Sequence, residues 1–484
     1  MNVRAFKRYA LPIACFLLLA CALFAPVPGT AEAAGGKTIT MGTSPDYPPY
    51  ENVDATGSGD IVGLDVDIAK YIAGKLGYEL KFAPSDFDGL IAALQTKRVD
   101  FVMSAMSVTE ERKQSVDFSD IYYNATNMII SLKDKSLLTL DELKGKRVGV
   151  QLGSTQEKVT DGLKDASILR LNKIPDLIQA LKANRIDAVI VEDAVAAGYA
   201  GANEDLKISV IPPSGEGEGY AIAFPKGSEL REEFNGVLAQ MKEDGTLQKM
   251  VDQWFGTEVA SGEAGGVFHF ERLGKYMGYI FRGVYVTLLF TLVSAAFGFL
   301  WGSVLSLFKI SKIAPLRWFS TVYTSIFRGT PLLLQLALIY YAIPQLFHYN
   351  IPALLAAGLA FGLNSAAYLS ETIRGGILAV DKGQREAALA LGIPYRTMMV
   401  SIIMPQAIKN ILPALVNECV ALVKESSLVS VIGVADLMRR ANVVQANTFM
   451  AFEPLIVVGA IYYALVLVLT SLARLLERRM RRSD

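Results

Sequence analysis

The chain has few residues whose types and spacing could support catalysis. His269 and His348 are isolated, so the sequence predicts no metal site. No nucleophile stands beside a base in a recognisable arrangement, and we expect no enzyme activity. The segment 36–38 (Gly-Lys-Thr) ends like a phosphate-binding loop, but Ala31 occupies the place of the glycine that such a loop needs. The chain therefore lacks a site of its own for ATP hydrolysis.

Two other features have chemistry suited to binding. Arg112 lies in a charged run, where an arginine is usually solvated, but its guanidinium could pair bidentately with a carboxylate. Ser154 and Thr155 follow Gly153 at the expected start of a helix. Backbone N–H groups at such a position can form a nest for an anion. Both features favour a small carboxylate ligand.

The elements that would position these residues are strands alternating with helices. We expect strands at 39–42, 80–82, 100–104, 147–150 and 188–191, and helices at 65–76, 90–94 and 174–183. Such alternation predicts parallel α/β layers. Because the pattern occurs as two similar sets, we expect two lobes with a ligand cleft between them.

The N terminus resembles a targeting segment. A positive start, an apolar stretch from Leu11 to Phe24 and small residues near Ala33 predict a signal peptide over 1–34. Lipoprotein processing at Cys21 and an uncleaved anchor are the alternatives, and all three place the adjoining α/β region outside the cytoplasm. The net charge is zero, so we expect no nucleic-acid partner.

Beyond residue 272, long apolar stretches dominate. We expect five membrane spans, at 283–308, 330–347, 352–373, 411–432 and 455–475. Five crossings place the arginine-rich C terminus in the cytoplasm, as the positive-inside rule predicts. Arg439 and Arg440 fall outside and are exceptions to that rule. Glu418, Lys424 and Glu425 lie in the fourth span, where such charges either face a pathway or form a packing pair.

Several motifs resemble known families. Six segments, in the same order, resemble polar-amino-acid-binding proteins of ABC importers: 42–51, 63–68, 85–91, 107–113, 152–157 and 219–224. Further along, 386–392 (Glu-Ala-Ala-Leu-Ala-Leu-Gly) and 402–405 are similar to the coupling motif of ABC-importer permeases, with Met404 in place of a leucine. The stretches 327–331, 368–377 and 424–433 resemble its amino-acid branch.

The resemblance implies a polar amino-acid ABC importer with its solute-binding protein fused to its permease (type I, histidine/glutamine permease family). The fold expected is an α/β bilobed domain of the periplasmic-binding-protein type (type II), followed by an all-α membrane domain. We expect the solute-binding domain at 35–256, the linker at 257–271 and the permease at 272–484. Lobe 1 would hold about 37–128 and 222–256, and lobe 2 about 129–221.

The same resemblance implies function and partners. The chain would bind a polar amino acid outside the cell membrane and translocate it inward as a homodimer. A separate cytoplasmic ATPase subunit would bind the ATP, so no cofactor is expected in this chain. That ATPase would contact the coupling residues Glu386, Ala387, Ala388 and Gly392.

The binding residues are also carried over from the family. Arg112 would hold the α-carboxylate with Ser154 and Thr155. Glu192 would hold the α-ammonium, with Asp193 as the alternative if the register differs by one residue. Tyr47 and Phe87 would sandwich the ligand, and Ser104 and Ser107 would add hydrogen bonds.

The identity of the substrate depends on the start of this domain. Family members that bind cationic side chains often have an aspartate where this chain has Ser44. Asp46 is near, but strand alternation predicts that its side chain points elsewhere. A neutral polar ligand such as glutamine is therefore expected over arginine, lysine or histidine.

Three other functions fit parts of the sequence less well. A ligand-gated channel of the glutamate-receptor type uses a similar domain, but its pore segment interrupts that domain, whereas here the domain is contiguous. An enzyme on the bilobed fold would not need five spans and a coupling motif. A sensor would signal by contact, since the sequence contains no kinase or cyclase segment.

Overall fold

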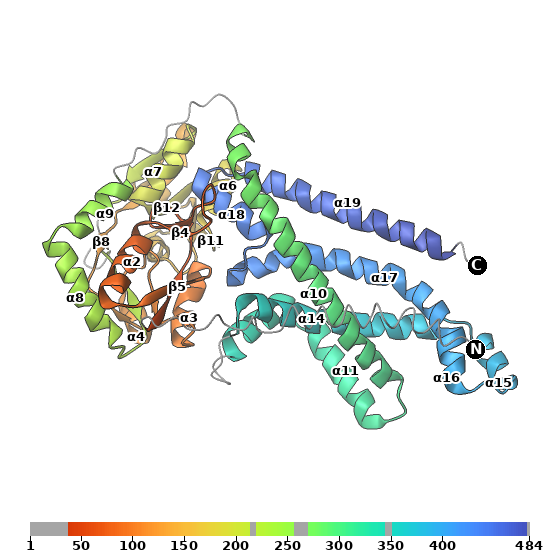
Figure 1. The fold of residues 1–484 in the computed structure, drawn as a ribbon. Coiled ribbons are helices and arrows are strands. Elements are labelled where there is room, and N and C mark those ends of the chain that lie inside the picture. Colours follow the sequence, from red (N-terminus) through yellow and green to blue (C-terminus); the bar gives the residue numbers. More distant parts are fainter. Residues whose placement is uncertain (1–36, 213–218, 256–269, 344–350, 482–484) are drawn as a thin grey trace.

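The structure, a computed structural model, describes residues 37–212, 219–255, 270–343 and 351–481. The predicted signal peptide, most of the predicted linker and both histidines lie outside the described residues. Figure 1 shows a mixed α/β domain at one end and long helices that extend away from it. We call residues 37–255 the N-terminal domain and residues from 270 onward the helical domain.

Lobe 1 is built on a five-stranded sheet. Its strands, in spatial order, are β5 (Glu79–Pro84), β1 (Thr38–Thr43), β6 (Phe101–Val102), β15 (Ala223–Phe224) and β7 (Asp117–Phe118). The helices of this lobe are α2 (Leu64–Leu76), α3 (Leu90–Gln95), α4 (Glu110–Ser115), α8 (Leu230–Glu243) and α9 (Thr246–Phe255). Strand β1 pairs in parallel with β5 and β6, as the alternation of strands and helices predicts.

Lobe 2 repeats this design. Its sheet, in spatial order, contains β11 (Ser167–Leu171), β10 (Arg147–Gln151), β12 (Ala188–Glu192), β9 (Asn127–Leu132) and β13 (Leu206–Val210). Its helices are α5 (Thr155–Val159), α6 (Ile174–Lys182) and α7 (Asp193–Ala202). The chain crosses between the lobes at β8 (Tyr123–Asn124) and β14 (Gly219–Tyr220), which pair antiparallel.

Helical periodicity explains the core of each lobe. In α2, buried apolar residues recur three or four positions apart, including Val66, Ala69, Ile72 and Ala73. Pro175 is the second residue of α6, in the first turn, where its missing N–H costs nothing. Leu177, Ile178 and Leu181 follow on the buried face of the helix. The two-lobed α/β fold expected from the sequence is therefore confirmed.

The helical domain contains the apolar elements predicted to span the membrane. Among the described residues, four helices are long and apolar enough to cross, or five if one bent pair counts as a span. The crossing helices are α10 (Met277–Ile310), α14 (Ala353–Leu378), α17 (Met404–Glu425) and α19 (Glu453–Arg481). The bent pair joins α11 (Ala314–Gly329) to the segment Leu332–Ala342 at 105° and contains most of the predicted second span.

Glycines allow α10 and α14 to approach closely. Gly298 and Gly302 form a G-x-x-x-G pattern on α10, and both face α14. A Cβ atom at Gly302 would lie 2.9 Å from the Ala366 carbonyl oxygen, and one at Gly298 would lie 2.8 Å from Ser365 Oγ. Small residues at such positions let membrane helices gain close van der Waals packing.

Lobe 1 of the N-terminal domain rests on the helical domain. Arg98 donates to the carbonyl oxygens of Tyr340 (2.6 Å) and Ile351 (2.9 Å), and its guanidinium lies 3.6 Å from the Tyr340 ring centroid. Asn447, in α18 (Leu437–Thr448), accepts from Asn52 at 2.7 Å. It also donates to the carbonyl of Val53 at 2.9 Å.

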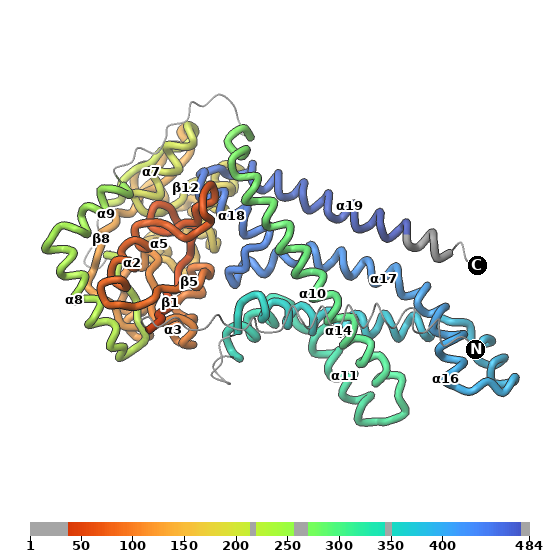
Figure 2. The backbone as a smooth tube through the Cα atoms, in the orientation of Figure 1, coloured from red at the N-terminus to blue at the C-terminus, as the bar shows by residue number. Residues whose placement is uncertain are grey.

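Lobe 2 contacts the C-terminal end of α18, the same short helix that Asn52 and Val53 contact from lobe 1. Asn203 donates to the Phe449 carbonyl oxygen at 2.9 Å, and the Phe449 ring lies 5.0 Å from that of Tyr199. Gly198 leaves room for this ring, since a Cβ atom there would lie 2.5 Å from it. Figure 2 shows α18 at the boundary between the two domains. We call α18 with Phe449 the docking helix.

The glycine contact of α10 gives a test of helix packing. We expect Gly302→Ala to lower the stability of the purified full chain by about 1–3 kcal/mol, because the added methyl overpacks against α14. Gly278→Ala is a control on the same helix, where nothing lies within 4 Å. That substitution should be neutral or stabilising by up to about 1 kcal/mol. Equal melting temperatures for the two variants in detergent would contradict close packing at Gly302.

Candidate binding site between the two lobes

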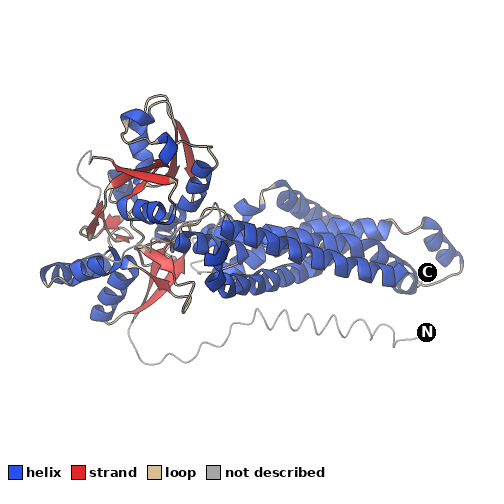
Figure 3. Cartoon of the chain, turned by 90° about the horizontal axis from the view of Figure 1, so that it is seen from above, coloured by secondary structure: helices blue, strands red, loops and turns tan. Residues whose placement is uncertain are grey.

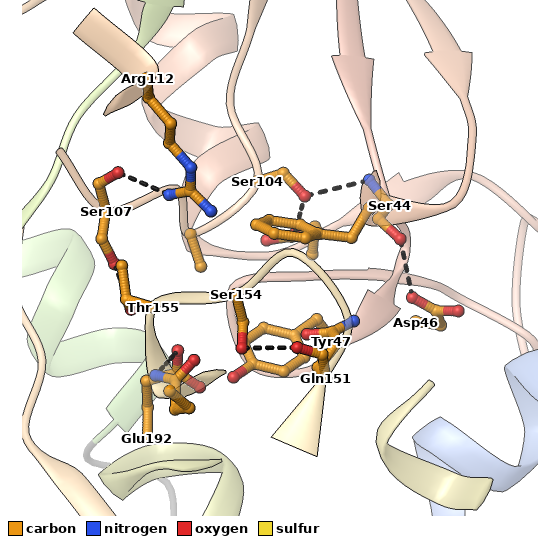
Figure 4. Close-up of a pocket in the computed structure, with 14 residues that line it drawn as sticks. Ser44, Asp46, Tyr47, Ser104, Ser107, Arg112, Gln151, Ser154, Thr155 and Glu192 are labelled. Atoms are coloured by element: carbon orange, nitrogen blue, oxygen red, sulfur yellow. Dashed lines mark hydrogen bonds between the residues drawn. The ribbon is translucent and has the colours of Figure 1, made fainter. Parts of the chain in front are cut away.

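A polar pocket lies between the lobes (Figure 4). All eight residues predicted to bind the ligand line it: Tyr47, Phe87, Ser104, Ser107, Arg112, Ser154, Thr155 and Glu192. Six further residues line it as well: Ser44, Asp46, Glu51, Ala105, Gln151 and Gln156. Both lobes contribute, so the pocket exists only while they are closed on each other.

Arg112 lies where the lobes meet. Its guanidinium donates to the carbonyl oxygens of Ser107 in lobe 1 (2.6 Å) and Gly153 in lobe 2 (2.7 Å). The Phe87 ring centroid is 5.5 Å from this guanidinium. Burial lowers the pKa of Arg112 to about 10, so the side chain keeps its charge at neutral pH. A buried cation at a polar pocket is well suited to a carboxylate.

The predicted anion nest is only partly formed. Ser154 and Thr155 stand at the start of α5, as expected, and Ser107 Oγ lies 3.2 Å from Thr155 Oγ1 across the cleft. The Ser154 amide, however, donates to the Gln151 carbonyl at 3.2 Å, and its hydroxyl donates to the same oxygen at 2.7 Å. The expectation that the Ser154 N–H is free to bind an anion is therefore wrong, because a local turn uses it.

Glu192 supplies a buried acid to the pocket. Gln156 donates to Glu192 Oε1 at 2.8 Å, whereas Oε2 is buried with no hydrogen-bond partner among the described residues. Burial raises the pKa of Glu192 to about 7. The alternative, Asp193, accepts from the backbone amides of Ala194 and Thr126 and is not among the residues that line the pocket. An ammonium group in the pocket would therefore meet Glu192.

Asp46 reaches the pocket, contrary to the strand-alternation argument. Its Oδ1 accepts from Ser44 Oγ at 3.0 Å, and both residues line the pocket. The alternation rule fails here because strand β2 (Asp46–Tyr47) has only two residues and follows a tight turn, in which the Asp46 amide donates to the Ser44 carbonyl at 2.7 Å. Asp46 thus places a carboxylate in the pocket beside Ser44.

Ser104 is held by a second buried acid. It donates to Glu51 Oε1 at 2.5 Å and accepts from the Ser44 amide at 3.2 Å. Burial and the neighbouring carboxylate of Asp65 raise the pKa of Glu51 well above its usual range. Glu51 therefore helps to position Ser104. The motif 42–51 contains Glu51, but nothing in its spacing marks it as a pocket residue.

The pocket is polar at both ends, but the two ends carry different polar groups. Figure 4 shows Arg112, Ser107, Thr155 and Glu192 along one side, and Ser44 with Asp46 on the opposite side. One end therefore combines a cation with an acid, and the other offers a hydroxyl and an acid. The polar groups of this arrangement match the charges of a zwitterion whose polar side chain extends away from its charged groups.

Comparisons with known proteins divide the chain in the same way. Residues 39–257 match the bacterial extracellular solute-binding proteins, family 3, and residues 296–482 match the inner membrane component of binding-protein-dependent transport systems. The arginine transport system permease protein ArtQ of Bacillus subtilis is 52% identical over 206 residues, which are 43% of this chain and 94% of that protein.

Relatives of the first half carry related names. The arginine-binding extracellular protein ArtP of Bacillus subtilis is 45% identical over 247 residues, 49% of this chain and 96% of that protein. For the second half, a putative glutamine transport system permease protein GlnP of Rickettsia felis is 48% identical over 202 residues, 42% of this chain and 93% of that protein. The chain belongs to the amino-acid ABC importer family. It joins a binding protein and a permease in one polypeptide.

Membership of this family bears on the channel alternative. The glutamate-receptor hypothesis receives no support from these relatives, which are transport components. We therefore call the N-terminal domain the binding domain and the helical domain the permease.

The motif predicted to couple to an ATPase lies far from the pocket. Helix α15 (Lys382–Ala390) stands at the end of the permease opposite the binding domain (Figures 1 and 3). Gly392 has φ +68°, a left-handed conformation that glycine allows, and the chain turns there into α16 (Tyr395–Met398).

Not all the predicted coupling residues are on the surface. Glu386 and Ala387 are exposed, but Ala388 is buried against Ile373 and Met398. The apolar side chains that do face outward are Leu389 and Leu391, which are 56% and 77% exposed. Ala388 thus packs α15 against the rest of the permease, and Leu389 and Leu391 provide large accessible apolar side chains at this site.

Glu192 gives a test that separates stability from binding. Because its folded pKa of about 7 exceeds the usual 4.5, stability from this group is present below pH 4.5 and is lost as the pH rises through 7. We expect Glu192→Gln to melt several degrees higher than the wild type at pH 8, with little difference near pH 4.5. The same variant should lose the thermal stabilisation that amino acids give.

Asp193→Asn is the matched control for that experiment. It should keep the response to an equimolar mixture of the twenty amino acids, measured by thermal unfolding of the full chain. A response retained by Glu192→Gln and lost by Asp193→Asn would assign the ammonium site to the neighbouring residue instead.

Proposed function

We propose that this importer chain binds a polar L-amino acid outside the cell membrane and passes it inward. The single observation that supports this most strongly is the buried pair of opposite charges at one end of the pocket. Arg112 from lobe 1 and Glu192 from lobe 2 both line it, and both are less than 10% exposed. A free amino acid is the ligand whose two charges need these two partners.

The orientation of the ligand follows from that pair. The α-carboxylate would face Arg112 and the α-ammonium would face the unpartnered Oε2 of Glu192. The side chain would then extend past Tyr47 toward Ser44 and Asp46 on the opposite side. Length and polarity at that end select the substrate.

We propose arginine as the leading substrate. Asp46 gives the far end of the pocket an acid that suits a guanidinium, and its position removes the sequence argument against a cationic ligand. Two relatives named for arginine match the permease and the binding domain respectively, whereas five of the permease relatives are named for glutamine. Glutamine remains the alternative, because Ser44 and Gln151 could bind a carboxamide.

Transport requires partners beyond this chain. One permease domain supplies half of a two-fold pathway, so we propose a homodimer that carries two binding domains. Cytoplasmic ATPase subunits would dock on the exposed surface of α15 and would bind and hydrolyse the ATP. This places α15 and the C terminus in the cytoplasm, and residues 1–34 would act as the signal that exports the binding domain.

The substrate proposal is tested by isothermal titration of the full chain in nanodiscs. We expect Asp46→Asn to weaken L-arginine binding by roughly 10- to 100-fold, since a charged hydrogen-bond partner of a buried cation is lost. L-glutamine, which carries no side-chain charge, should change by less than about 3-fold.

Arg112→Ala is the control for the common end of the ligand and should abolish binding of both amino acids. If Asp46→Asn lost the same factor of affinity for arginine and for glutamine, Asp46 would not discriminate between ligand side chains. Failure of both amino acids to bind the wild type would assign a different ligand to the pocket.

The ATPase proposal is tested at Leu391. We expect Leu391→Asp to reduce copurification of the cognate ATPase subunit by about 10-fold or more, because it places a charge in an apolar contact. Val210→Asp is the control, since Val210 is 55% exposed on the binding domain. Amino-acid binding should persist in both variants. Undiminished copurification with Leu391→Asp would exclude this surface from ATPase docking.

A further inference from the structure

Four charged side chains meet where the docking helix touches the mouth of the pocket. Arg439 Nη1 lies 3.1 Å from Asp86 Oδ1 and 3.4 Å from Asp46 Oδ2. Lys173 Nζ lies 3.6 Å from the same Asp86 Oδ1. The exposed fractions of these side chains are between 4% and 9%. Charges this well buried interact strongly, because water screens them little.

These groups come from three parts of the molecule. Asp46 and Asp86 belong to lobe 1, Lys173 precedes α6 in lobe 2, and Arg439 belongs to the permease. The Lys173–Asp86 pair therefore joins the two lobes and exists only while they are closed. Arg439 shares the oxygen of that pair, and its positive charge repels Lys173, so the net electrostatic gain from bringing Lys173 to Asp86 is smaller.

The docking helix also brings an acid close to Lys173. Asp436 caps α18 by accepting from the amides of Met438 and Arg439. Burial raises the pKa of Asp436 to about 6, whereas the positive charge of Lys173 lowers it. The two charges therefore interact. The permease thus offers a new cation to Asp86 and a new anion to Lys173.

The same arginine acts on the pocket. Asp46 lines the pocket at its side-chain end, and its Oδ2 is the oxygen that faces Arg439. A guanidinium already beside Asp46 opposes the binding of a second cation there. Arg439 Nη2 is buried without a hydrogen-bond partner among the described residues. The hydrogen-bonding capacity of Arg439 is therefore not fully used by its structural contacts.

We propose that Arg439 is a release residue. When the binding domain rests on α18, the charge of Arg439 repels Lys173 at Asp86 and opposes a cationic ligand side chain at Asp46. Both effects loosen the closed, loaded lobes beside the membrane pathway. The effect on lobe closure stands alone, whereas the competition at Asp46 rests on the cationic substrate proposed above.

This role accounts for a charge that the positive-inside rule does not. Arg439 and Arg440 both lie on the side of the binding domain. Arg440 donates to the carbonyls of Ala435 and Tyr279 within the permease itself. Arg439 alone of this pair reaches the binding domain, which makes Arg440 a matched control.

The test measures closure of the lobes in the full chain in nanodiscs. Spin labels on Gly74→Cys and Gly162→Cys report the distance between lobes, because one of these exposed glycines lies on each lobe. A side chain fits at both positions, since a Cβ atom there would have no other atom within 4 Å. Cys15, Cys21 and Cys419 are replaced by serine. An equimolar mixture of the twenty amino acids is titrated. Double electron–electron resonance measures the distance between the labels, which gives the amino-acid concentration at which half of the molecules are closed.

We expect Arg439→Gln to close at about 10-fold lower concentration than the wild type, the size of a typical coupling between sites. Arg439→Lys keeps the charge and should stay near the wild type, and Arg440→Gln should match it. Closure of Arg439→Gln at the same or a higher concentration would overturn the release role while leaving amino-acid binding intact. A wild type that never closes would contradict the proposed function, and the release role with it.

Discussion

Removing a zwitterion from water requires a partner for each of its charges, and the binding domain depends on this constraint. A buried charge without a partner costs several kcal/mol, about as much as a domain's whole margin of stability. In the proposed binding mode the partners are divided between the lobes, with Arg112 on one and Glu192 on the other. Neither lobe can satisfy the ligand alone, so binding and closure become one event.

The permease meets a different constraint, because lipid does not drive its helices together. Close approach at Gly298 and Gly302 replaces the hydrophobic effect with direct packing against α14. Ionisable groups within the helices find partners in the protein. Glu371 lies beside Lys309 and Arg374, and Glu418 accepts from Ser365 at 2.8 Å. Lys424 and Glu425, by contrast, are exposed in this single chain.

Local pattern predicts most of the fold and little of the fine geometry. Strand and helix positions follow from periodicity, and the pocket residues follow from motifs whose order matches a known family. The predictions for the Ser154 amide and the Asp46 side chain are wrong, because a turn and a two-residue strand override simple alternation. Ala388 does not reach the surface predicted for it, since only tertiary packing shows which face of α15 is covered.

The contacts of Arg439 could not be predicted from sequence at all. Its partners, Asp46 and Asp86, lie far away along the chain, with sequence separations of 393 and 353. A violated topology rule was the only signal that this arginine had a special environment.

The seating of the binding domain on α18 of its own chain has an evolutionary consequence. An importer with a free receptor can acquire a new substrate by recruiting another receptor that fits the same permease. Here a tethered domain occupies that surface at an effective concentration on the order of millimolar, which a dilute outsider cannot match. Receptor and pathway are therefore inherited as one unit. A change of substrate would then have to come from mutation within the pocket, where Asp46 would have to suit both the proposed ligand and Arg439.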